Sequence, residues 1–176
     1  MKLEFRKLRA DEIDCRIGQI KENGLSLLLY KDARCDMNVL DETVGAMNWK
    51  REHTRDNQNC IVSIWDEDKK QWISKEDVGT QSNTEAEKGL ASDSFKRACV
   101  NWGIGRELYT APFIWVKAGD AEIYKDPFTK KYKCRNDFSV AKLTYTKTGD
   151  IDGLAIRNNK TGNVVFAKMP KEKNNE

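Results

Sequence analysis

The spacing of apolar and polar residues divides the chain into short alternating segments and two longer segments with helical spacing. Apolar residues at every second position predict strands. The predicted strands are residues 12–20, 25–30, 48–54, 59–65, 71–78, 113–116, 138–146, 151–157 and 163–167. Turn-forming residues separate them, including Asn23-Gly24 in the first connection and Thr148-Gly149 near the end. The pattern therefore predicts a hairpin at the start and a meander at the end.

Two segments have helical spacing. Asp32 can cap the first helix and Gly45 can stop it. Its predicted core face consists of Ala33, Met37, Leu40 and Val44. The second helix is predicted over residues 84–102, where Thr84 and Glu87 form a capping box. Its predicted core face consists of Ala91, Ser94, Phe95, Ala98 and Trp102.

Three predicted strands followed by the long helix suggest the core of the fold. Strand 59–65 has few polar residues on either side, which predicts a central strand covered on both faces. The expected fold class is α+β, with an antiparallel sheet packed on helices and a strand-strand-strand-helix core. The N-terminal hairpin and the C-terminal meander complete it. We expect one domain over residues 1–168 and a frayed tail over residues 169–176.

Composition limits the class of protein. The chain of 176 residues is 39% hydrophobic and 34% charged, with a mean hydropathy of -0.75 and a net charge of +3. No apolar stretch reaches the length of a membrane span, and the N-terminus lacks the apolar region of a signal peptide. These features predict a soluble, cytoplasmic protein. Five cysteines without a C-x-x-C spacing, and one histidine, indicate reduced thiols rather than a zinc site.

Cations on the predicted core suggest a nucleic-acid surface. Lys96 and Arg97 are adjacent on the long helix, with Lys96 predicted nearly opposite its core face and Arg97 on its flank. Cations on a helix-backed sheet can neutralise phosphates, although such a pair can also be a solubilising helix face. A second basic segment has interleaved aromatic residues and is either a solvated loop or a binding site. It contains Tyr124, Lys125, Phe128, Lys130, Lys131, Tyr132, Lys133 and Arg135.

Catalytic interpretations have less support. The carboxylates of Asp66, Glu67, Asp68 and Asp77 could bind a metal ion in a nuclease, but acidic hairpin tips are commonly solvated. His53 has no Ser or Cys motif near it in the sequence. The sequence has no P-loop, so it does not support ATP-driven recombinase chemistry. We therefore expect no catalytic residue, no metal site and no cofactor.

The order of several motifs resembles a known family. The chain reads EIDCRIGQ, YKDAR, LDETVGAMNW, KEDVG and KGLASDSFKRACVNWGIGR at residues 12–19, 30–34, 40–49, 75–79 and 88–106. Together these stretches resemble the Rad52/Rad22 group of single-strand annealing proteins, most of all its short phage and prophage members. The resemblance runs from about residue 12 to residue 166 and depends on the set rather than on any one motif.

The resemblance implies a function and a set of site residues. It implies a non-enzymatic, ATP-independent protein that coats single-stranded DNA, anneals complementary strands in homologous recombination and assembles into rings or helical filaments. A recombination exonuclease or a single-strand-binding protein is a further expected partner, in a host cytoplasm if a phage encodes the chain. In the family a Lys-Arg pair lines the DNA groove, which corresponds to Lys96 and Arg97. The complete set of predicted DNA-binding residues is Lys96, Arg97, Arg34, Lys88, Arg106, Lys50, Arg51 and Lys75.

Two alternatives from other classes stay open at this point. A double-stranded-RNA-binding domain has a similar order of one helix, three strands and a second helix. A metal-dependent nuclease would use the acidic hairpin between the second and third strands of the core.

Overall fold

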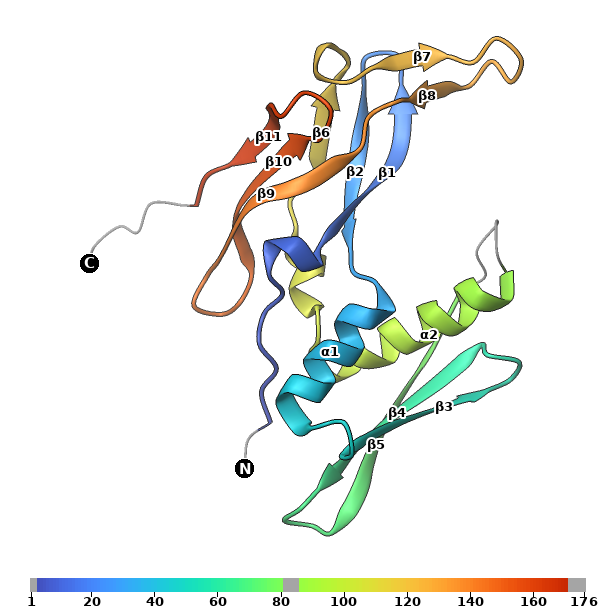
Figure 1. The fold of residues 1–176 in the computed structure, drawn as a ribbon, viewed down its shortest axis with the longest axis vertical. Helices are drawn as coiled ribbons and strands as arrows, with labels where there is room; N and C mark the ends of the chain where they lie inside the picture. The colour runs from blue at the N-terminus through green and yellow to red at the C-terminus, as the bar shows by residue number, and fades with distance from the viewer. Residues whose placement is uncertain (1–2, 81–85, 171–176) are drawn as a thin grey trace, which may run out of the picture. The chain divides into compact units, whose positions relative to one another are not determined.

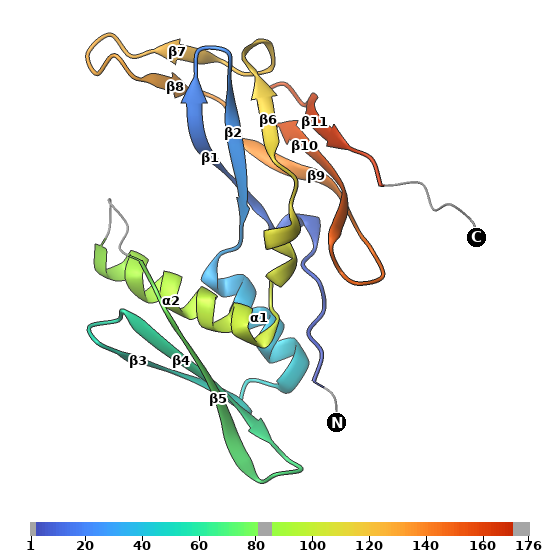
Figure 2. The same cartoon turned by 180° about the vertical axis from the view of Figure 1, so that it is seen from behind.

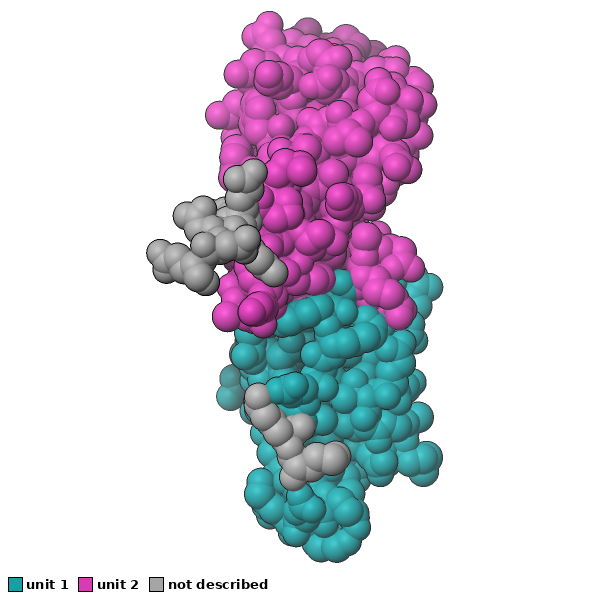
Figure 3. All heavy atoms as spheres, turned by 90° about the vertical axis from the view of Figure 1, so that its left-hand side faces the viewer, with its two compact units in different colours: residues 1–8, 31–106 teal, residues 9–30, 107–176 magenta. Residues whose placement is uncertain are grey.

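The computed structural model describes residues 3–80 and 86–170. The chain forms two compact units, each built from two separate stretches. Unit 1 consists of residues 1–8 and 31–106, and unit 2 consists of residues 9–30 and 107–176 (Figure 3). The predicted tail falls largely on residues 171–176, which lie outside the described part of the chain. No helix in the described part is long and apolar enough to cross a bilayer.

Unit 1 contains two helices and a three-stranded antiparallel sheet. Its elements in chain order are α1 (Ala33–Val44), β3 (Trp49–Thr54), β4 (Asn59–Asp66), β5 (Gln71–Val78) and α2 (Ala86–Trp102). β4 is the central strand of the sheet, between β3 and β5. α2 packs against β4 and β5, and α1 packs against α2 (Figure 1). The predicted strand-strand-strand-helix core is confirmed.

The ends of the unit 1 elements follow the predicted signals. Asp32 accepts a hydrogen bond from the Cys35 amide at 2.8 Å and so caps α1, and Gly45 ends that helix at a φ of 83°. The capping box of α2 depends on Thr84, which lies outside the described residues.

Two expectations about burial in unit 1 are wrong. α1 buries Cys35, Asp36, Val39 and Leu40, so its core face is rotated from the predicted one. The periodic pattern excluded Asp36 because it is charged, but an ion pair with Lys31 allows its burial. In addition, α2 covers only one face of β4. Among the described residues of unit 1, no helix covers the other face of the sheet.

Unit 2 is a six-stranded antiparallel sheet with an added hairpin. Its strand order is β11-β10-β9-β1-β2-β6, and the edge strands β11 and β6 approach each other, so the sheet curls (Figure 2). The six strands are β1 (Asp14–Lys21), β2 (Gly24–Tyr30), β6 (Ile114–Lys117), β9 (Phe138–Tyr145), β10 (Ile151–Asn158) and β11 (Val164–Lys168). Short 3-10 helices cover Ala10–Glu12, Arg106–Thr110 and Ala118–Asp120. The predicted N-terminal hairpin and C-terminal meander are thus both present.

The curled sheet encloses an apolar core. Its buried side chains come from four strands and include Leu25, Leu27, Val116, Leu154 and Ile156. The pairing of Asp14 with Ser139 joins the initial hairpin to the final meander within one chain. Local sequence patterns do not show this pairing, because more than a hundred residues separate the two strands.

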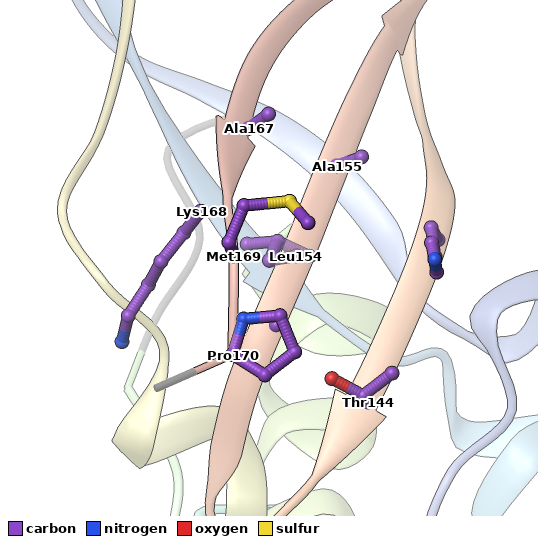
Figure 4. A pocket seen from close by; sticks show the side chains of 9 residues that line it. Thr144, Leu154, Ala155, Ala167, Lys168, Met169 and Pro170 are labelled. Carbon is purple, nitrogen blue, oxygen red and sulfur yellow. The ribbon is translucent and has the colours of Figure 1, made fainter. Parts of the chain in front are cut away.

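Glycine allows a close approach on the outside of this sheet. Met169 and Pro170 lie over β9 and β10 and line a small apolar pocket (Figure 4). A Cβ at Gly153 would lie 2.3 Å from Thr144 Oγ1 and 2.9 Å from Pro170 Cγ. The last described residues therefore pack on β10 only because position 153 has no side chain.

One predicted loop is a strand pair. β7 (Ile123–Lys125) and β8 (Tyr132–Cys134) form a two-stranded antiparallel hairpin in the basic segment of unit 2. The six residues between them form its tip. The sequence indicated a loop because charged residues interrupt the short alternation on both sides.

Candidate nucleic-acid interface

The Lys-Arg pair of α2 divides between two sides of the helix. Arg97 is exposed, at 45% of its side-chain surface, and its Nε lies 3.5 Å from Asp77 Oδ1 on β5. Lys96 is partly buried and is less exposed than Arg97. The prediction gave Lys96 the more exposed position, which is wrong. The prediction assumed that α2 has one buried face. In the structure the helix is buried on two sides, against the sheet through Phe95 and Ala98 and against α1.

Lys96 lies close to a buried ion pair of unit 1. Lys31 Nζ is 2.5 and 2.6 Å from the two oxygens of Asp36, and both side chains are buried. Burial raises the pKa of Asp36 to about 6, although the positive charges of Lys31 and Lys96 oppose this shift. Asp36 therefore attracts Lys96 toward α1.

Arg34 occupies the first turn of α1. Its side chain is 83% exposed, and its Nε lies 3.0 Å from Asp32 Oδ2. An ion pair this exposed is weak, so the guanidinium is accessible to another anion. Arg34 is thus an exposed cation on the helix that precedes the sheet of unit 1.

Three cations gather at the C-terminal end of α2, and we call them the α2 cation cluster: Lys75, Arg97 and Arg106. Lys75 Nζ donates to the Asn101 carbonyl at 2.8 Å, and Arg106 Nη2 donates to the same oxygen at 3.1 Å. Arg97 joins them through Asp77, which accepts a hydrogen bond from Asn101 Nδ2 at 3.1 Å. The unpaired carbonyls of a helix C-terminus carry partial negative charge, which stabilises cations there.

Lys50 and Arg51 lie on opposite faces of the sheet. The Arg51 guanidinium is 4.7 Å from the Phe95 ring, on the face that α2 covers. Lys50 points to the uncovered face, 5.2 Å from the Trp72 ring and 3.0 Å from Glu52. Lys88 lies in the first turns of α2, and its side chain is outside the described part of the structure.

The uncovered face of the sheet contains an aromatic pair. Trp65 and Trp72 pack edge to face with ring centroids 5.5 Å apart, and Trp72 is 40% exposed. Lys50 lies beside this pair. Exposed rings next to cations can stack on unpaired bases. The register of β4 and β5 brings the two rings together, because Trp65 lies directly opposite Trp72.

The predicted DNA-binding residues therefore do not form one continuous surface in unit 1. Lys75, Arg97 and Arg106 lie together, whereas Lys96 lies toward α1 and Lys50 lies on the uncovered face of the sheet.

The carboxylates of the acidic hairpin, and Asp77 on β5, have partners within the protein. Asp66 pairs with Lys69 at 3.0 Å, and Glu67 contacts Lys70 and accepts a hydrogen bond from Trp65 Nε1. Asp77 pairs with Arg97. Within residues 3–80 and 86–170, no group of three or more His, Cys, Asp and Glu side chains could hold a metal ion.

The cysteines of the described residues are free thiols. Burial raises the pKa of Cys60 to about 11 and that of Cys15 to about 12. These thiols therefore stay protonated near neutral pH, and Cys60 acts as a small apolar residue of the core.

A comparison with protein families points to one of them. Residues 63–123 match the family model described as Rad52/22 family double-strand break repair protein. The match supports a role in DNA recombination and repair. It covers about a third of the chain and includes β5, α2 and the whole α2 cation cluster. No curated protein and no solved structure matches the chain.

Proposed function

We propose that this protein binds single-stranded DNA without ATP and anneals complementary strands during recombination and repair. The α2 cation cluster contacts the phosphate backbone, with Lys96 and Arg34 contributing from the side of α1. The observation that carries the proposal is that the whole cluster lies inside the stretch that matches the Rad52/22 family model. The protein needs no cofactor and catalyses no covalent step.

The geometry of the cluster suits a reversible hold on phosphates. Lys75 and Arg106 each contact a backbone carbonyl of α2, and both side chains have further N–H donors. Arg97 contacts Asp77 at 3.5 Å, a long and partly exposed ion pair that a phosphate can replace. Phosphate contacts leave base edges free, which annealing requires, because each base must be tested against a complement.

Repetition makes such weak contacts sufficient. In the proposed mechanism the chain forms a homo-oligomer, a ring or a helical filament, in which neighbouring copies repeat the cluster along one strand. Linked weak sites give high overall affinity while each nucleotide can still exchange. Electron microscopy with and without an oligonucleotide tests this part directly, and a lone monomer in both samples contradicts it. A recombination exonuclease or a single-strand-binding protein is the expected partner of the assembly.

The binding surface is tested by removing the Lys-Arg pair of α2. In Lys96→Ala with Arg97→Ala, we expect affinity for a labelled single-stranded oligonucleotide to fall at least ten-fold, about 1.4 kcal/mol. The slope of log affinity against log salt should decrease by about 1.4, because each lost phosphate contact removes about 0.7 on single strands.

The matched control removes another adjacent cation pair from unit 1. Lys69→Ala with Lys70→Ala changes the net charge equally at the exposed β4–β5 turn, where the side chains are 63% and 69% exposed. We expect its affinity and its salt slope to equal those of the wild type. An equal loss in both double variants would mean that net charge, not the α2 site, governs binding.

A second candidate function rests on the element order of unit 1. One helix, three antiparallel strands and a second helix also describe double-stranded-RNA-binding domains. Competition between single-stranded DNA and duplex RNA for the labelled oligonucleotide separates the two. We expect unlabelled single-stranded DNA to displace the label at much lower concentration, and the opposite order would favour the second candidate.

A further inference from the structure

The β7–β8 hairpin concentrates positive charge on unit 2. It extends away from the six-stranded sheet (Figures 1 and 2). Residues 123–135 contain five cations and one carboxylate, a net charge of +4, compared with +3 for the whole chain. Like charges this dense repel one another, so the segment favours an anionic ligand.

The tip of the hairpin is a well-bonded turn built around Asp126. Its Oδ1 accepts hydrogen bonds from the amides of Phe128 and Thr129 at 2.9 and 2.8 Å. Its Oδ2 lies 2.5 Å from Lys133 Nζ, which together with these amides holds the pKa of Asp126 well below its usual range. The backbone of Asp126 bonds both to Lys130 and to Lys131 at 2.9 Å. The conformation of the tip thus depends on Asp126 and not on the Phe128 ring.

This turn holds a large apolar side chain in the solvent. Phe128 is 92% exposed, the highest value among the large hydrophobic side chains of the described residues. The two tyrosines of the hairpin are already covered by cations, with Arg135 4.5 Å from the Tyr124 ring and Lys125 5.8 Å from the Tyr132 ring. Among the described aromatic rings of the hairpin, Phe128 is therefore the one most available to stack on a ligand.

Two cations follow Phe128 along the tip, after Thr129. Lys130 and Lys131 are both exposed, and within the described residues neither has a carboxylate within ion-pair distance. The same six-residue tip therefore carries an exposed aromatic ring and two available positive charges. Unpaired nucleotides match this combination, because each has a planar base and an adjoining phosphate.

We propose that the β7–β8 hairpin is a base-stacking finger, a contact for single-stranded nucleic acid on unit 2 that is separate from the α2 cation cluster. Phe128 stacks on an unpaired base, and Lys130 and Lys131 hold the phosphates beside it. The inference rests on the proposed function, since it adds a contact to the same strand. An anionic membrane fits less well, because one exposed ring gives little apolar area for insertion.

The test compares two strands of equal charge, a thymidine 30-mer and a 30-mer of abasic sites. We expect Phe128→Ala to weaken binding of the thymidine strand about ten-fold without changing its salt slope, because stacking carries no charge. On the abasic strand, Phe128→Ala and wild type should bind equally. Lys130→Ala with Lys131→Ala should lower the salt slope by about 1.4 on both strands.

The controls come from the same unit. Phe113 is 76% exposed but lies outside the hairpin, and Phe113→Ala should bind both strands as the wild type does. Lys142→Ala with Lys147→Ala removes two exposed cations elsewhere in unit 2 and should leave the salt slope unchanged. Thermal unfolding should be unaffected by Phe128→Ala, because the ring is solvent-exposed.

Three outcomes overturn the finger. One is thymidine-strand binding by Phe128→Ala equal to that of Phe113→Ala. Another is an equal loss on the abasic strand, and the third is capture by phosphatidylserine vesicles that depends on Phe128 while DNA binding does not. In each case the wild type still binds the oligonucleotide, so the proposed function survives. If the wild type binds neither strand, both proposals are overturned. If the hairpin variants lose affinity and Lys96→Ala with Arg97→Ala does not, only the α2 site is overturned.

Discussion

The two units use their cations differently. In unit 1 the cations predicted from sequence are mostly attached to the protein itself: Lys75 and Arg106 to carbonyls of α2, Arg97 to Asp77, and Lys50 to Glu52. In the unit 2 hairpin, Lys125 and Arg135 lie over aromatic rings, and Lys130 and Lys131 are exposed. Charge counted along a sequence therefore does not equal charge that a ligand can reach.

This difference changes what binding costs in each unit. A phosphate at Arg97 must replace the carboxylate of Asp77, whereas a phosphate at Lys130 replaces only water. Removing a paired cation such as Lys75 from unit 1 should therefore alter stability as well as binding, whereas removing Lys130 or Lys131 from the hairpin should alter binding alone. The following substitutions test this contrast.

The largest effect is expected at the buried ion pair. Lys31→Met leaves Asp36 buried without its cation, which should lower the free energy of unfolding by about 3–5 kcal/mol. Urea denaturation measures the change. Lys31→Met with Asp36→Leu should recover most of the loss, because no charge is left buried. In contrast, Lys130→Ala with Lys131→Ala should unfold as the wild type does, and a large loss there would refute the contrast.

The close contact of sheet and helix in unit 1 gives the next effect. A Cβ at Gly79 would lie 2.7 Å from the Ser94 amide nitrogen and 2.8 Å from the Leu90 carbonyl oxygen. Gly79→Ala should therefore push β5 from α2 and cost about 1–3 kcal/mol. Gly119→Ala in unit 2 meets open space and serves as the control. Equal melting temperatures for the two variants would show that α2 can move away from position 79 without loss of stability.

A smaller effect is expected for a cation that caps α2. Lys75→Ala removes a hydrogen bond to the Asn101 carbonyl and a cation lying 4.7 Å from the Trp102 ring. We expect a loss of about 0.5–1 kcal/mol in the free energy of unfolding, the range of one favourable charge at a helix end. Lys130→Ala, which removes the same side chain from the hairpin, is the reference. If both variants lose the same stability, Lys75 is no more structural than Lys130.

The smallest effect concerns His53, the single histidine of the chain. Burial, and then the positive charge of Arg51, lower the pKa of His53 below its usual 6.5. The unfolded chain therefore binds a proton at His53 more readily than the folded chain does. The free energy of unfolding should be independent of this group above about pH 6.5 and should decrease slightly as the pH falls below that value. An NMR titration of this one imidazole gives the pKa directly. Arg51→Ala should raise it, and an unchanged value would mean that Arg51 points away from His53.

Much of the fold followed from local patterns. Apart from β7 and β8, the strands of both units agree with the predicted alternation to within a few residues, and β5 has the predicted limits. Asp32 caps the start of α1 with its carboxylate, and Gly45 ends the helix with a positive φ that glycine adopts without strain. Such features depend on neighbours in the sequence, which a pattern can represent.

What the patterns missed depends on distant residues. The burial of Asp36 requires Lys31 and the packing of α1 on α2, and the orientation of Lys96 follows from that packing. The β7–β8 hairpin is a local exception: charged residues interrupt the short alternation on both sides of its tip, and the contacts of Asp126 to Phe128, Thr129 and Lys133 that stabilise the tip leave no periodic signal. The sequence indicated the cations of the candidate site, and the structure was needed to show which of them lie together.

The path of the chain has a consequence for dissection of the protein. β2 and β6 are hydrogen-bonded neighbours, with Leu27 opposite Ile114, and residues 31–106 are inserted between them. The chain leaves the curled sheet and returns to it at the same strand pair, so a short designed loop could join those strands in place of the insertion. This shortened chain would show whether unit 2 binds a nucleic acid by itself.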